Sequence, residues 1–329
     1  MSKINLMFRN EIQEYIQPYR DKGYKVWSIS RLNNFNQCKR GYYFTYIDKK
    51  DQKQGVYSTL GTCCHEALEE VYEGKRDTLN KESFDNQFAL CELFGINFPK
   101  SKWDIKGNYK KDIDMFFKYF KKEEGKFISE LGFVLEIDDK NIIMGFIDLL
   151  EILPDGKVKI TDFKTSASFD KPEKLLHAGR QLCIYQMALE QLYGLEVISN
   201  KWLMLKYLDI SVGEVTKKNI QGNKLIKNIE SPLKKLFKKQ GYDAFTTDLY
   251  IAQAYEGGLD ILPQDIKDKI SIEVHPEYYD VTDEIKAETM EYIKNTIKAI
   301  GEETEWECKP DKFFCMNLCG FNPKYCNGE

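Results

Sequence analysis

The segment at 141–166, NIIMGFIDLLEILPDGKVKITDFKTS, constrains the fold more than any other. Both of its halves are rich in β-branched and apolar residues, and they flank a Pro-Asp-Gly sequence at 154–156. Proline favours the first position of a turn and glycine the left-handed one, so this sequence is typical of a three-residue hairpin loop. The pattern predicts a β-hairpin in which Leu153 faces Lys157.

The predicted register brings two carboxylates together. Counting back along both strands from the loop places Asp148 opposite Asp162, unless a bulge or a one-residue slip breaks the pairing. Side chains two apart in a strand share a face, so Lys164 lies beside Asp162 among apolar neighbours. Two facing, half-buried anions repel each other and require positive charge, from Lys164 and from a divalent cation with oxygen ligands. This combination suits metal-assisted hydrolysis of a phosphodiester, and a simple Asp–Lys ion pair on a sheet surface is the alternative.

Hydrophobic periodicity over the rest of the chain predicts helices around a sheet. We expect helices at 27–47, 58–74, 173–194 and 283–303, mostly helix at 81–125, and extended segments at 201–210 and 271–282. Ser28 or Ser30 is expected to cap the first helix, and Tyr43 is expected to point inward. We interpret 1–329 as one domain. Its core spans about 27–212 and 271–302, a lysine-rich insertion spans 213–270, and a cysteine-rich tail spans 303–329.

Composition narrows the class of protein. The 329 residues are 42% hydrophobic, which supports a substantial core, and no apolar run is long enough for a membrane span. The first residues lack the apolar stretch of a signal peptide, so we expect a cytoplasmic protein. The sequence contains no G-x-x-x-x-G-K-[ST] loop, which argues against an ATPase or helicase.

One stretch of the chain is strongly basic although the net charge is −4. Residues 217–239 contain eight lysines and a single acid, Glu230. The lysines are Lys217, Lys218, Lys224, Lys227, Lys234, Lys235, Lys238 and Lys239. Such a patch can neutralise phosphates, and a solvated helix face is the alternative.

Eight of the nine cysteines fall into two groups, and Cys38 stands apart from both. Four lie in the tail with the spacing Cys308-x6-Cys315-x3-Cys319-x6-Cys326. In a cytosolic chain, clustered cysteines indicate a metal site rather than disulfides. The cysteines of the helix-like segments are interpreted as small buried side chains: Cys63, Cys64, Cys91 and Cys183.

Five motifs, in their order along the chain, resemble the PD-(D/E)XK nuclease superfamily. G-F-I-D ends at Asp148, and D-F-K follows at 162–164. The stretch at 28–44, G-T-C-C-H at 61–65 and Q-L-C-I-Y at 181–185 narrow the resemblance to the RecB-like branch, which includes AddAB-type and CRISPR-adaptation exonucleases. The resemblance implies a restriction-endonuclease-like α/β core, with a central mixed sheet flanked by helices.

The resemblance also implies roles for single residues. His65, Asp148, Asp162 and the backbone carbonyl of Phe163 would bind Mg²⁺ or Mn²⁺, and Lys164 would be the catalytic lysine. Gln181 and Tyr185 share a helix face and would contact DNA or support the site, although both could equally lie at the rim of an amphipathic helix. Glu136 is a weaker candidate near the metal.

Some members of the branch hold a 4Fe–4S cluster with one cysteine near the N-terminus and three near the C-terminus. Cys38, Cys315, Cys319 and Cys326 resemble that set, and the cluster would staple the tail to the first helix. The usual C-x-x-C is here C-x3-C, and Cys308 could replace one of the four. Zinc is the alternative metal.

The function that the resemblance implies is a metal-dependent DNA exonuclease of repair, recombination or phage DNA processing, with a helicase or recombination protein as a possible partner. The alternatives are an endonuclease of the junction-resolvase or restriction type, and a non-catalytic DNA-binding subunit. The aromatic stretch at 109–120 could stack on bases, and a place in the core is its other interpretation.

Overall fold

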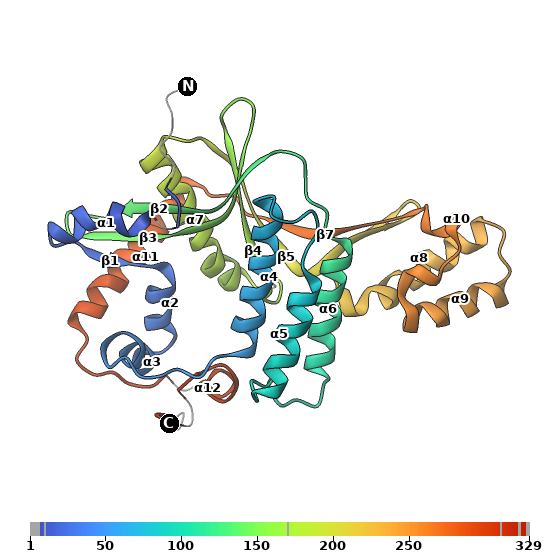
Figure 1. Cartoon of the computed structure of the whole chain (residues 1–329), viewed down its shortest axis with the longest axis horizontal. Coiled ribbons are helices and arrows are strands. Elements are labelled where there is room, and N and C mark those ends of the chain that lie inside the picture. Colours follow the sequence, from blue (N-terminus) through green and yellow to red (C-terminus); the bar gives the residue numbers. More distant parts are fainter. Residues whose placement is uncertain (1–6, 10, 170, 310, 322–323, 327–329) are drawn as a thin grey trace.

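A mixed sheet organises the computed structural model of the chain (Figure 1), which describes residues 7–9, 11–169, 171–309, 311–321 and 324–326. In the described residues the sheet has seven strands. They are β1 (Lys25–Trp27), β2 (Lys126–Glu136), β3 (Asn141–Ile152), β4 (Val158–Lys164), β5 (Val197–Val212), β6 (Val215–Gln221) and β7 (Ile270–Tyr278). The order is β1-β3-β4-β5-β6, with β2 also paired to β3 and β7 to β5. The pairs β1–β3 and β4–β5 are parallel and the others antiparallel, which confirms the predicted mixed α/β fold.

The hairpin β3–β4 has the predicted register. Leu149 pairs with Thr161 and Ile152 with Val158. The Leu153 amide donates to the Lys157 carbonyl at 2.9 Å, and the loop glycine has a φ of 85°. The turn chemistry therefore sets the pairing along both strands.

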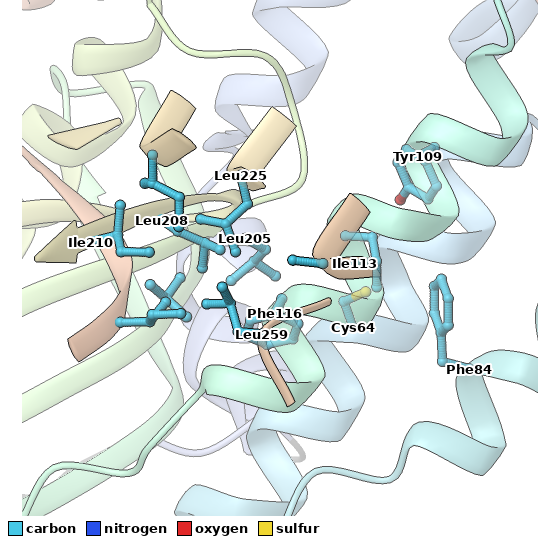
Figure 2. Close-up of a cluster of buried hydrophobic side chains, with 14 of the residues drawn as sticks. Cys64, Phe84, Tyr109, Ile113, Phe116, Leu205, Leu208, Ile210, Leu225 and Leu259 are labelled. Carbon is cyan, nitrogen blue, oxygen red and sulfur yellow. The ribbon is translucent and has the colours of Figure 1, made fainter. Parts of the chain in front are cut away.

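Three helices cover one face of the sheet: α4 (Val56–Tyr72), α5 (Lys81–Leu93) and α6 (Ile105–Tyr119). Figure 2 shows their apolar side chains packed with those of β5, around residues such as Phe116 and Leu205. The predicted stripe of α4 is buried: Leu60, Cys64, Leu68 and Val71. Residues 81–125 are mostly helical, as predicted, and residues 94–104 form an irregular connection between α5 and α6.

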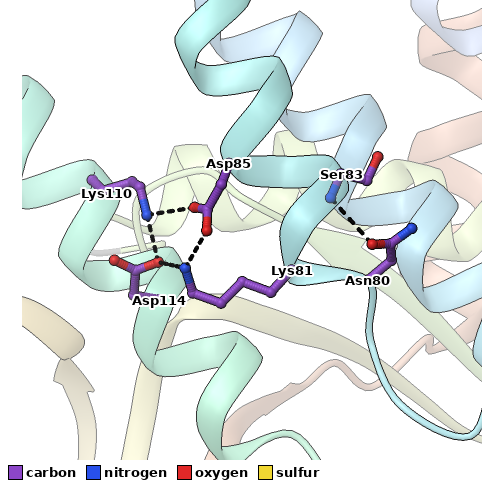
Figure 3. Close-up of polar contacts among 6 residues, drawn as sticks. All are labelled: Asn80, Lys81, Ser83, Asp85, Lys110 and Asp114. Carbon is purple, nitrogen blue, oxygen red and sulfur yellow. Dashed lines mark hydrogen bonds and ion pairs between the residues drawn. The ribbon is translucent and has the colours of Figure 1, made fainter.

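Four side chains fasten α5 to α6 (Figure 3). The Lys110 ammonium lies 2.7 Å from both Asp85 and Asp114. The Lys81 ammonium lies 2.6 Å from Asp85 and 3.1 Å from Asp114. Alternating charges in such a network hold each other in place better than a single exposed pair does. The network therefore fixes the two helices that flank the 94–104 connection.

The opposite face of the sheet carries α2 (Ile29–Gln37), α7 (Pro172–Tyr193) and α11 (Asp283–Glu302), while α1 (Ile12–Asp21) packs near β2 and β3. Pro172 begins α7, and Gly194 ends it with a φ of 63°. Proline at the first helical position and a left-handed glycine after the last are the favoured ends of a helix. No helix in the described part of the chain is long and apolar enough to cross a membrane.

The single helix predicted at 27–47 is interrupted. Ser28 caps α2, as one of the two expected residues, but the chain becomes extended at Cys38. The Cys38 sulfur then accepts a hydrogen bond from Gly41 and begins the short α3 (Lys39–Tyr42), which a π-helical turn, η1 (Tyr43–Ile47), continues. Tyr42 is buried in place of Tyr43, which is half-exposed, because the break changes the helical phase.

Residues 213–270 project from the sheet as a lobe, at the right of Figure 1. It contains β6, η2 (Gly222–Lys224), α8 (Leu225–Lys239), α9 (Ala244–Gly257), η3 (Gly258–Ile261) and α10 (Gln264–Lys267). The long strand β5 carries it, since β6 and β7 both pair with the last part of β5. Leu233 and Phe237 of α8 belong to the same core cluster as Ile251 of α9.

The tail returns to the N-terminal part of the chain. Its helix α12 (Lys312–Asn317) lies beside α3 in Figure 1. The Trp306 ring stacks on Tyr42 with centroids 5.8 Å apart, and the Lys53 amide donates to the Gly320 carbonyl at 2.9 Å. These contacts place the tail against residues 38–53, as the predicted stapling of the two ends requires.

Candidate active site

Asp148 and Asp162 lie next to the last pair of the hairpin ladder, Leu149 and Thr161. Asp162 is 1% exposed. One oxygen of Asp148, Oδ2, accepts a hydrogen bond of 2.8 Å from the backbone N–H of Phe163. The structure therefore brings the two predicted carboxylates into one buried place at the end of the hairpin.

The electrostatics of this pair are unfavourable. Burial, and then the neighbouring Asp162, hold the pKa of Asp148 well above its usual range. Neither oxygen of Asp162 accepts a hydrogen bond within the described residues. Two adjoining carboxylates that are largely removed from water are costly, so this place calls for a cation or a proton.

Lys164 supplies one positive charge. Its Nζ lies 2.6 Å from Asp162 Oδ2, at ion-pair distance but without the directionality of a hydrogen bond. The same Nζ donates to Gln181 Oε1 at 2.8 Å, and Gln181 Nε2 donates to the Tyr185 hydroxyl at 2.6 Å. Helix α7 presents Gln181 and Tyr185 on one face, four residues apart. Tyr185 is buried, so it stands behind Lys164 rather than on the surface.

His65 reaches the site from α4. Its Nδ1 lies 3.5 Å from Asp148 Oδ2, and it makes a hydrogen bond with the backbone of Phe163. Burial lowers the pKa of His65, and the charges of Asp162 and Lys164 act on it in opposite directions. A third of the side chain (33%) stays exposed, so the loss of solvent is partial. The neutral imidazole that results is the form that binds metals.

The donor set fits a divalent cation. Within the described residues, no group of three or more His, Cys, Asp or Glu side chains is already arranged as metal ligands. Asp162, whose oxygens accept no hydrogen bond among the described residues, Asp148 and the neutral His65 nevertheless form a set that Mg²⁺ or Mn²⁺ accepts. His65, Asp148, Asp162 and the Phe163 carbonyl are the groups that would hold it.

The structure corrects our expectation for Glu136 and brings the other glutamate of β2, Glu130, to the site. Glu136 lies opposite Ile142, six residues or about 20 Å along β3 from Asp148, and accepts from the Tyr19 hydroxyl. Its assignment near the metal was wrong. Glu130 falls between the pairs that Ser129 and Leu131 make with β3, and therefore faces Asp148.

Glu130 is a residue that the sequence analysis missed. Its backbone φ of 50° is unusual for a non-glycine residue in a strand. Burial raises the pKa of its carboxyl group. Its charge contributes to the raised pKa of Asp148. Strained residues are concentrated at functional sites. An acid within the apolar run of β2 was the available signal, but only the pairing of β2 with β3 identifies its neighbour.

The eight lysines lie on the lobe, away from the carboxylates. On β5, Lys217 pairs with Ile210 and Lys164 pairs with Met204. These two residues of β5 are six positions apart, which is about 20 Å along the strand. The lysines of α8 are exposed. Lys234 pairs with Glu230 and Asp248, and Lys239 pairs with Glu214.

The tail cysteines and Cys38 gather around one small cavity. Its lining includes all five thiols in question: Cys38, Cys308, Cys315, Cys319 and Cys326. The Cys326 and Cys308 sulfurs are 3.8 Å apart, and none of the five cysteines forms a disulfide within the described residues. Burial, and then Cys38, raise the pKa of Cys308 to about 12. Positions 310, 322–323 and 327–329 of the predicted tail lie outside the described residues. The other four cysteines are buried, as expected.

The fold, the carboxylate pair and Lys164 together are typical of a nuclease, and comparison with known proteins gives the same class. The model of the PD-(D/E)XK nuclease superfamily matches residues 26–327, so this chain belongs to that superfamily, whose members are nucleases. The chain is similar to the Gene 69 protein of Mycobacterium phage D29. The two are 26% identical over 198 residues, which cover 51% of this chain and 70% of the phage protein. A solved structure described as "Crystal structure of SSO0001" covers 61% of this chain and 82% of its own, at 16% identity and a TM-score of 0.20. That score is too low to support an argument.

Proposed function

We propose that this nuclease is a metal-dependent DNA exonuclease whose active site is formed by His65, Asp148, Asp162 and Lys164. The observation that carries the proposal is the buried carboxylate pair, in which Asp162 has no hydrogen-bond donor while Lys164 stands 2.6 Å away. A purely structural ion pair would not require the second buried carboxylate, Asp148. Exonuclease action is what the resemblance to the RecB-like branch implies.

Each residue has a distinct part in the proposed chemistry. A bound Mg²⁺ or Mn²⁺ would polarise the phosphoryl oxygen and lower the pKa of water. Lys164, held by Gln181, orients the attacking water or stabilises the charge that develops on the phosphate. Asp148 and Asp162 balance positive charge, and His65 remains neutral. The product would carry a 5′-phosphate.

Two further parts of the chain have proposed roles. The exposed lysines of the 213–270 insertion would be an accessory contact for DNA phosphates away from the site. The five thiols around one cavity support a 4Fe–4S cluster in the tail, with zinc as the alternative. The cluster would have a structural role. A helicase or recombination partner is part of the same proposal.

The test uses purified full-length protein, Mn²⁺ and end-labelled DNA. We expect degradation of linear single- or double-stranded DNA from its ends, and none by Asp162→Ala or Lys164→Ala. Gln191→Ala, at the far end of α7, is the control and should cut at the wild-type rate. Undiminished activity in both site variants would contradict the assignment. Cleavage of covalently closed circular duplex would favour an endonuclease, and an inert wild type that binds DNA would favour a binding subunit.

A further inference from the structure

A groove of about 770 Å³ lies beside the tail. Its walls are the N-terminus of α4, the α5–α6 connection at 97–100, and α12 with the residues that follow it. All three lie on the lower side of the molecule in Figure 1. We call this hollow the tail groove.

The chemistry of the tail groove combines apolar surface with positive charge. Phe313 of α12 is 59% exposed, and Met316 and Leu318 are exposed beside it. Lys53 and Lys100 line the groove, and no Asp or Glu is present in the described part of its lining. Folded proteins seldom leave such apolar surface open unless something binds there.

Another hollow differs from the tail groove in charge. It measures about 420 Å³ and lies between the end of α6 and β7, also with aromatic walls. Its lining contains three acids, Glu123, Glu151 and Glu273, and three lysines, Lys121, Lys122 and Lys201, so its formal charges cancel, whereas the described lining of the tail groove has lysines alone. Charge therefore distinguishes the two hollows and favours the tail groove for an anionic chain.

An exposed tryptophan extends the same surface. Residues 97–100 also line a neighbouring hollow that includes Trp103, which is 70% exposed. One acid, Asp104, lies in the same lining and caps the start of α6. The Lys102 ammonium lies 5.2 Å from the centre of the Trp103 ring. Aromatic faces next to lysines are the means by which proteins bind single-stranded nucleic acid, since unpaired bases stack while the lysines meet the phosphates. The bases of a duplex are already stacked and offer no such contact.

The tail groove is also well placed and firmly supported. Val56 lines it, and His65 follows nine residues later on α4, about 14 Å along the helix axis. The ion pairs in Figure 3 fasten α5 to α6, the two helices that the connection joins. We infer that the tail groove binds a single-stranded segment of the DNA whose phosphodiester is cut at the carboxylate site. This inference rests on the proposed function for the identity of the substrate.

The test measures binding without cleavage. A labelled thymidine oligonucleotide is titrated with the full-length protein, with no divalent metal added, and fluorescence anisotropy gives the Kd. Phe313→Ala and Trp103→Ala should each weaken binding about fivefold or more. Lys100→Ala should reduce the slope of log K against log salt by about 1. The matched control is Phe245→Ala on α9, where the side chain is 80% exposed but outside the groove.

The outcomes separate the groove from the catalytic proposal. An unchanged Kd in the Phe313→Ala/Trp103→Ala variant, with an unchanged thermal midpoint, would overturn the inference. An equal loss of affinity for a blunt duplex would overturn its restriction to single strands. Groove variants should keep the maximal cleavage rate at saturating DNA, because they leave the carboxylates untouched. A wild type that binds the strand through the groove but cuts nothing would support the groove and contradict only the proposed function.

Discussion

The ammonium of Lys164 lies between Asp162 Oδ2, at 2.6 Å, and Gln181 Oε1, at 2.8 Å. A lysine side chain has many rotamers, so two fixed partners, one in an ion pair and one in a hydrogen bond, restrict where its charge can lie. Gln181 is in turn held by the hydroxyl of the buried Tyr185. Helix α7 therefore determines the position of the lysine of β4.

Removing the amide of Gln181 should slow the reaction. We expect Gln181→Leu to lower kcat about 10- to 100-fold, the usual effect of removing a partner that orients a catalytic group. KM should change little, and Tyr185→Phe should cause a smaller loss in the same direction. Steady-state kinetics on labelled DNA measures both. Gln191→Leu, on the same helix near Glu136, is the control, and an equal loss there would show a general effect on α7.

Neutralising Asp148 should stabilise the metal-free protein while inactivating it. The pKa of Asp148 is raised in the folded state, so between the unfolded and folded pKa values the folded chain binds more protons than the unfolded chain. Stability therefore falls as pH rises through this window. Asn at 148 can still accept from Phe163 and carries no charge. We expect Asp148→Asn to raise the free energy of unfolding at pH 7 by at least about 1 kcal/mol.

Urea titration at several pH values checks this prediction. The gain should be present at pH 7 and should shrink as pH falls toward the ordinary pKa of aspartic acid. If Asp148→Asn instead lowers the free energy of unfolding at pH 7 without added metal, then other groups of the folded protein already stabilise the charge of Asp148, and the prediction is wrong. Added Mn²⁺ should stabilise the wild type more than the variant.

The cysteine tail provides an optical prediction. If the cavity holds a 4Fe–4S cluster, anaerobically purified protein shows broad visible absorbance, and Cys315→Ala loses it. Zinc would leave the protein colourless and would appear in metal analysis. Cys91→Ala is the control because Cys91 is buried in α5, outside the cavity. Absorbance that survives in Cys315→Ala but disappears in Cys308→Ala would make Cys308 the ligand.

The sequence predicted what local chemistry determines. The Pro-Asp-Gly loop sets the register of β3 and β4, so the carboxylate pair followed from counting residues. The apolar stripe of α4 and the glycine at the end of α7 were equally local signals. Long-range pairing was not predictable in this way. The place of Glu130 opposite Asp148 and the misplacement of Glu136 both depend on how β2 lies against β3.

Two other features of the structure were not predicted from the sequence, for similar reasons. The sulfur of Cys38 caps a new helix and interrupts the one expected at 27–47. The spacing of apolar residues, from which helices are predicted, does not reveal such a cap. The tail groove forms from three segments that are far apart in sequence, so no single stretch indicated it. Chain segments that meet only in three dimensions escape periodicity and motif spacing alike.

The most direct test of the account compares Asp162→Asn with the wild type in a single-turnover assay. Labelled linear DNA is bound to excess protein, and Mn²⁺ starts the reaction. Asp162 is almost fully buried and Asn has the same shape, so DNA binding measured beforehand should not change. We predict that the rate of phosphodiester hydrolysis falls at least about 100-fold, the scale of losing a group that stabilises the transition state. A variant that binds DNA equally well and cleaves it at the wild-type rate would contradict the account.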